Sequence, residues 1–167
     1  MGLSEKLVAN RQKRNLMQML EKLNGSNLEG AVRRQFYYPE SGELLNSILD
    51  SMRNGRWPKK SYTAVTGDAQ SELTTYMSTL GSGEKTMLCF FPNYSAQIDD
   101  VISDLPLLEV VADSVAEWYK LASASELHFF FCSSTDLRKG VALDVYEADP
   151  VVHGTAGAIF DLYYWNA

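Results

Sequence analysis

Residues 127–147, with the sequence LHFFFCSSTDLRKGVALDVYE, decide the fold of this chain. Apolar and polar side chains alternate over residues 141–147, which is the period of a β-strand with one buried face. Residues 127–133 form an apolar run of strand length, and residues 134–140 between the two segments are typical of a turn. The stretch therefore predicts a β-hairpin. A further strand is predicted at residues 158–165, after a turn at Asp149 and Pro150.

The first 60 residues have a helical period instead. Leucines at helical spacing predict a helix over residues 4–23, and a similar pattern predicts another from Ser41 to Met52. Between them, a capping-box pattern at residues 26–29 predicts a short helix that ends before Pro39.

The middle of the chain is mixed. We expect a brief strand at residues 62–66, a helix that starts at Asp68, a strand at residues 85–91, and two helices within residues 96–122. Helices first and neighbouring strands last predict an α+β fold, in which N-terminal helices pack on a mostly antiparallel sheet whose strands lie largely in the C-terminal half. We expect one globular domain over residues 1–167.

Charge divides this domain into two parts. The chain has 167 residues and a net charge of −6. Residues 1–60 contain eleven lysines and arginines and six carboxylates, whereas residues 61–167 contain four and fifteen. A basic helical third thus precedes an acidic α+β body, and such an asymmetry bears on partners and association rates. Because the acidic body would repel a polyanion, we expect no direct binding to nucleic acid.

No segment has the length and hydropathy of a membrane span, and no apolar signal segment follows Met1. We therefore expect a cytoplasmic protein without membrane association. Cys89 and Cys132 each lie within an apolar run, where a free thiol usually behaves as a small buried hydrophobe.

An acidic helix is the most informative feature for function. If residues 106–122 are helical, Glu109, Asp113 and Glu117 recur every four residues and share one face. We call these three residues the acidic ridge. Three more aspartates lie just upstream and extend its negative field: Asp99, Asp100 and Asp104. A charged face is usually only solvated, but this one also fits a docking surface for a basic protein partner.

Catalytic and metal-binding patterns are weak. The only histidines, His128 and His153, are 25 residues apart, and no metal-ligand spacing includes them, so we predict no metal and no cofactor. Ser133 near His128 lacks the motif of a serine nucleophile. A small enzyme with a pocket near His128, Ser133 or the segment from Asp144 to His153 remains the alternative function.

In general profile, as a small acidic α+β protein without a catalytic signature, the chain is similar to bacterial immunity proteins. This resemblance implies a protein-binding module that neutralises a basic toxin, such as a nuclease, by covering its active site. A third hypothesis is an interaction or structural subunit of a phage or mobile element that self-associates through its basic third and acidic body. The sequence leaves the oligomeric state open.

Overall fold

The computed structural model describes residues 2–63, 66–80, 85–92, 107–123, 127–154 and 156–166. Its elements follow the order α1 (Leu3–Lys22), η1 (Ser26–Ala31), β1 (Val32–Phe36), α2 (Glu40–Arg53), β2 (Lys59–Thr63), α3 (Thr66–Ser78), β3 (Lys85–Pro92), β4 (Leu107–Val111), η3 (Ala112–Ser114), α4 (Val115–Ser123), β5 (Leu127–Ser134), β6 (Lys139–Glu147), α5 (Pro150–His153) and β7 (Ala158–Asn166). The predicted α+β class is confirmed.

The strands form one seven-stranded antiparallel sheet in the order β1-β4-β3-β5-β6-β7-β2. The hairpin predicted at residues 127–147 is present as β5 and β6, and β7 pairs with β6 along its whole length. The edge strand β1 belongs to the basic third of the chain, and the other edge strand, β2, begins at the end of that third with Lys59 and Lys60.

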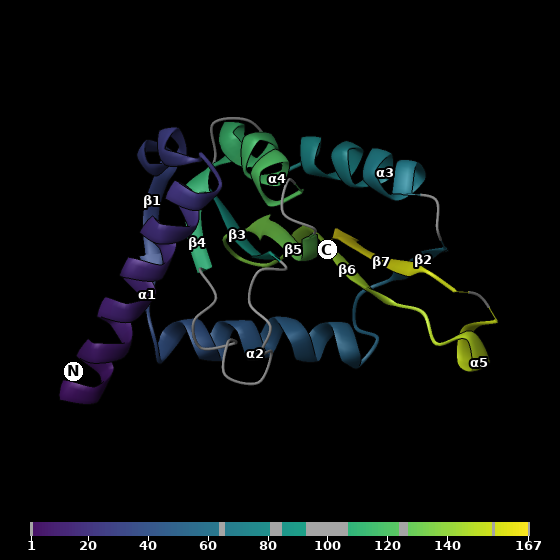
Figure 1. Cartoon of the computed structure of the whole chain (residues 1–167), viewed down its shortest axis with the longest axis horizontal. Coiled ribbons are helices and arrows are strands. Elements are labelled where there is room, and N and C mark those ends of the chain that lie inside the picture. Colours follow the sequence, from purple (N-terminus) through teal and green to yellow (C-terminus); the bar gives the residue numbers. More distant parts are fainter. Residues whose placement is uncertain are drawn as a thin grey trace.

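Helices cover both faces of the sheet (Figure 1). On one face, α1, α3 and α4 pack in a core around Trp118, Phe90 and Phe130. On the other face, α2 packs in a second core through Leu45, Ile48 and Met52. Central strands buried on both faces need apolar side chains on both sides, which explains the aromatic run at residues 129–131.

The two cysteines lie on opposite faces of the sheet. Cys89 of β3 belongs to the core under α2, and Cys132 of β5 belongs to the other core. Both are free thiols, and burial raises the pKa of each. Their side chains are thus separated by the sheet and are kept in the unreactive protonated form.

Two strands were missed in the sequence. Residues 32–36 continue from a short 3-10 turn into β1 rather than into a helix. Residues 107–111, which we predicted as the start of a helix over 106–122, form β4, and helix follows only from Val115. In β4, Leu107, Leu108 and Val110 are fully buried between β1 and β3. Pairing on both edges and burial on both faces outweigh the helical spacing of this segment.

The backbone of Gly140 lies very close to the side chains of Trp165 and Ser133. A Cβ atom there would lie 2.3 Å from Trp165 Cζ2 and 2.8 Å from Ser133 Cβ. The Trp165 ring is not free to withdraw, because it stacks on Trp57 at a centroid distance of 3.6 Å. We expect Gly140→Ala to lower the free energy of unfolding by about 1–3 kcal/mol through overpacking.

Chemical denaturation checks this prediction, with Gly30→Ala as the control because nothing lies within 4 Å of a Cβ atom at Gly30. An equal stability change in both variants would contradict the packing argument.

Candidate functional site

The acidic ridge does not exist as a single helical face. Glu109 is in β4, where its side chain is only 15% exposed and forms an ion pair with Lys85 at 3.3 Å. Asp113 is exposed in η3, and Glu117 is exposed in α4 with an ion pair to Lys120 at 3.0 Å. The prediction of a shared face is wrong because the chain changes from strand to helix between the first and last of these residues. The assisting residues Asp99, Asp100 and Asp104 lie outside the described residues.

The structure does not bring together His128 and Ser133, two of the residues named for the alternative catalytic pocket. His128 and Ser133 are five positions apart on β5, which separates them by about 17 Å along the strand. The Ser133 hydroxyl is buried and donates to the Ser134 carbonyl at 2.9 Å. His128 Nδ1 lies 3.4 Å from the Val145 carbonyl oxygen. Within the described ranges, no three histidine, cysteine or carboxylate side chains are grouped as metal ligands would be.

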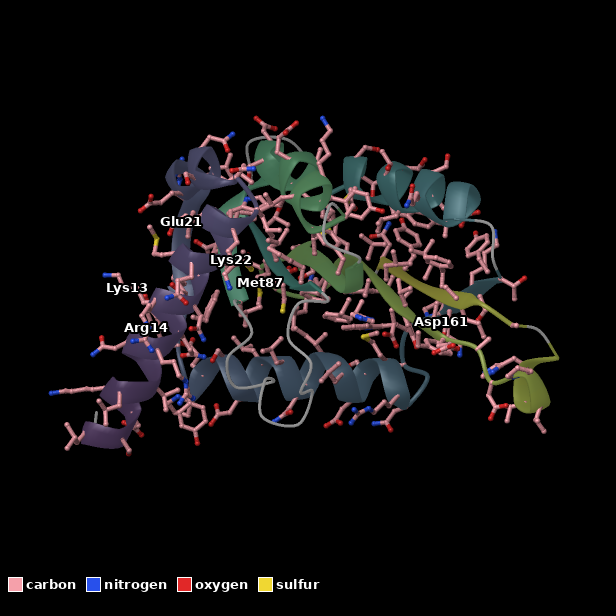
Figure 2. All side chains as sticks on the ribbon, viewed as in Figure 1. Lys13, Arg14, Glu21, Lys22, Met87 and Asp161 are labelled. Carbon is pink, nitrogen blue, oxygen red and sulfur yellow. The ribbon has the colours of Figure 1, made fainter. Side chains whose placement is uncertain are left out.

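Asp144 and Asp161 instead form a carboxylate pair on the face of the sheet that α2 covers. They are direct cross-strand partners in β6 and β7. Asp161 is buried and accepts hydrogen bonds from Ser61 Oγ at 2.6 Å and Tyr146 Oη at 3.0 Å, with Lys59 Nζ 3.5 Å away. Figure 2 places Asp161 at the end of the sheet remote from α1. One carboxylate thus joins β6, β7 and the edge strand β2.

Asp144 lacks such partners. Among the described residues, no hydrogen bond reaches its half-buried carboxylate. Burial raises the pKa of Asp144, and the facing charge of Asp161 raises it further, while His128, Lys59 and Arg53 lower it in part. Burial, assisted by the same two carboxylates, raises the pKa of Tyr163 to about 12. In this cluster two carboxylates face each other, and the nearby cations Lys59 and Arg53 offset part of their charge.

The direction of the pKa shift of Asp144 predicts how the stability of the chain depends on pH. Because its pKa is higher in the folded chain than in the unfolded chain, stability is greatest at low pH and falls as pH rises through the folded pKa. Asparagine does not titrate, so we expect Asp144→Asn to be more stable than the wild type at about pH 7, by about 0.5 kcal/mol, the size of a cross-strand like-charge penalty. Urea denaturation from about pH 4 to about pH 7 should show the difference growing with pH.

Asp136→Asn is the control, because a hydrogen bond from Ser134 lowers the pKa of Asp136 and the sign is reversed. This variant should be less stable than the wild type at neutral pH, and the difference should vanish in acid. The same pH trend in both variants would contradict the assignment.

The connection between β6 and β7 forms a projecting turn, which we call the valine tip (residues 147–154). Val151 is 93% exposed and Val152 is 74% exposed, although both are apolar. The turn is well fastened: the Asp149 carboxylate accepts from Val151 N at 2.9 Å, and Asp149 N donates to His153 Nδ1 at 2.9 Å. Gly154 closes α5 with φ +67°, a left-handed conformation that glycine adopts without strain.

The strands and turn around the valine tip are acidic in sequence, although Lys59 and Arg53 of other elements lie near the carboxylate pair. Residues 140–167 contain four carboxylates and no lysine or arginine. The carboxylate pair lies at its base, and Glu147 and Asp149 lie within it. A preformed apolar tip with an acidic rim is therefore presented to solvent. The sequence predicted this place only as a turn at Asp149 and Pro150; the cap of α5 and the exposure of the two valines are seen in the structure.

A hollow of about 280 Å³ lies at the opposite end, between α1 and the edge strand β1. We call it the basic groove. Its charged lining consists of Lys13, Arg33, Arg34 and Glu29, and its apolar lining includes Leu16, Met17 and Val32. Figure 2 shows Lys13 and Arg14 on the outer side of α1. Arg34 is held by Glu40 at 2.8 Å.

Comparison with known proteins gives no relative: no family model, no curated protein and no solved structure matches this chain. No helix in the described ranges has the length and apolar character needed to cross a membrane.

Proposed function

We propose that this chain is a protein-binding module that engages a basic protein partner through the valine tip. The observation that supports this proposal best is the exposure of Val151 and Val152 on a capped turn that also contains the carboxylates Glu147 and Asp149. Large exposed apolar side chains with a polar rim are typical of binding surfaces. A preformed turn loses little conformational entropy on binding, which favours affinity.

An inhibitor that covers the positive active site of a basic toxin, in the manner of an immunity protein, is the particular form of this function that we propose. The projecting valine tip suits insertion into a cleft, and its carboxylates suit a cleft that attracts phosphate. Because Glu109, Asp113 and Glu117 do not share one face, the acidic ridge does not support this hypothesis. We propose that Glu147 and Asp149 make the electrostatic contacts with the partner instead. We propose the cytoplasm as the compartment, where Cys89 and Cys132 remain thiols.

The test is site-specific crosslinking. A photoreactive residue at position 151, in cells that make the protein, should capture a protein with a basic surface, and one at position 7 of α1 should not. With that partner purified, Val151→Asp combined with Val152→Asp should weaken binding about 100-fold, since each valine contributes about 1.5 kcal/mol when buried. Glu147→Lys should mainly slow association, and more so at low salt.

Leu3→Asp combined with Leu7→Asp is the matched control, because it also changes two exposed apolar residues to aspartate, at the other end of the molecule. If the partner is a toxin, the wild type and the control variant should restore growth on co-expression and the tip variant should not. Equal binding by the tip and control variants would overturn the proposal.

A further inference from the structure

The two exposed surfaces at opposite ends of the molecule have complementary chemistry. Figure 1 shows α1 at one end of the sheet and α5 at the other. The basic groove lies beside α1, and the valine tip contains α5. Because the two surfaces are far apart on one copy, they are able to meet only between copies.

The elements that form the basic groove carry more positive than negative charge. Its two elements, α1 and β1, carry seven lysines and arginines and two glutamates. Among the described residues, Lys13 and Arg14 take part in no ion pair. Met17 at the mouth of the groove is 42% exposed, and Leu16 and Val32 lie deeper. With Glu29 in the lining and Arg34 paired to Glu40, the groove still has an excess of positive charge, beside an apolar floor.

The valine tip has the opposite combination. Its two exposed valines match the apolar floor, and its carboxylates Glu147 and Asp149 match the positive charge of the groove. The nearby cations Lys59 and Arg53 act on the carboxylate pair of Asp144 and Asp161, and residues 147–154 themselves contain no lysine or arginine. Complementary charge around an apolar contact fixes the orientation of two partners and speeds their encounter.

We propose that the valine tip of one copy of this chain docks in the basic groove of a second copy. This contact joins two different surfaces, so after two copies have docked, one still has a free tip and the other a free groove. Further copies are therefore able to add head to tail, which gives open chains or closed rings. The inference rests on the proposed function, because it uses the same valine tip, and it adds a second copy of the chain as a further binding partner of that tip. A basic partner that takes the tip therefore competes with self-association.

Sedimentation velocity gives the first measurement. At about 0.05 M salt, the wild type should sediment as species larger than a single chain, and at about 0.5 M salt these should dissociate, because screening weakens the charged contact. A wild type that sediments as one 18.7 kDa chain at every concentration in low salt would overturn the proposal.

Two variants, each defective in one surface, give the sharper measurement. The first is Val151→Asp with Val152→Asp, and the second is Lys13→Glu with Arg33→Glu. Each alone should be monomeric, with its self-dissociation constant raised at least about 10-fold. An equimolar mixture should form a dimer and nothing larger, because only one intact tip and one intact groove remain.

Arg56→Glu with Lys120→Glu is the control for the groove variant, since it reverses the same number of exposed positive charges outside the groove. It should assemble like the wild type. A mixture that stays monomeric, or a tip variant that still assembles alone, would overturn head-to-tail docking. If the wild type is monomeric while the tip variant loses the crosslinked basic partner, the proposed function stands and this inference fails.

Discussion

Trp57→Ala should lower the free energy of unfolding by about 3–5 kcal/mol, the usual cost of removing a buried tryptophan. Trp57 lies in the short connector between α2 and β2 and is only 8% exposed. Its ring stacks on Trp165 at 3.6 Å with an interplanar angle of 3°, and Phe131 lies 6.4 Å away. The connector is therefore a part of the core and not a spacer.

The loss affects more than one element. Trp165 is held by Trp57 on one side and by the hydrogen bond from its Nε1 to the Leu137 carbonyl at 2.9 Å. Without Trp57, a cavity opens under α2 beside the last strand of the sheet. A loss of this size corresponds to a fall in melting temperature of roughly 10 °C for a chain of this length.

Thermal and chemical denaturation check the prediction. Trp57→Phe keeps a ring in the stack and should lose less than half as much stability. Tyr38→Ala removes an aromatic side chain that is 41% exposed and should change stability by no more than about 0.5 kcal/mol. A Trp57→Ala variant as stable as Tyr38→Ala would show that the stack does not hold the connector.

Asp161→Ala should be the second most damaging substitution. It removes the acceptor of two hydrogen bonds, from Ser61 and Tyr146, and leaves Lys59 without its carboxylate. Hydrogen bonds to a charged group contribute about 1.5–3 kcal/mol each, so a net loss of about 3 kcal/mol is expected after relief of the repulsion from Asp144. The edge strand β2 should loosen first, since Ser61 and Lys59 belong to it.

Hydrogen exchange with mass analysis locates the effect: amides of residues 59–63 should exchange faster in Asp161→Ala, and those of β3 and β5 should be affected least. Asp161→Asn keeps an acceptor of the same size and should lose less stability than Asp161→Ala. If both variants lost the same free energy of unfolding, the charge of Asp161, and not its hydrogen bonds, would be what stabilises β2.

Local patterns predicted much of this fold. The helical period of residues 4–23 and 41–52 appears as α1 and α2, and the two-residue period of residues 141–147 appears as β6. These predictions succeed because each element buries the side chains that its own period places on one face. The period of residues 106–122 failed, because β4 is buried on both faces and its apolar residues fit two periods.

The candidate sites were harder to predict, since each depends on neighbours distant in sequence. Asp144 and Asp161 are 17 positions apart and become partners only through the register of β6 and β7. The basic groove needs α1 beside the edge strand β1, and β1 itself was missed. Val151 and Val152 were visible as residues, but their exposure depends on where α5 lies in the fold.

By itself, the sequence determined the α+β class, the hairpin at its centre, the turn at Asp149 and Pro150 and the division into a basic and an acidic part. These are properties of neighbouring residues, and backbone periodicity and charge are enough to fix them. Only the tertiary structure decided that the acidic ridge is divided between strand and helix, that two carboxylates face each other, and that basic and acidic apolar surfaces lie at opposite ends. Strand pairing brings together residues far apart in sequence, and no local pattern encodes its register.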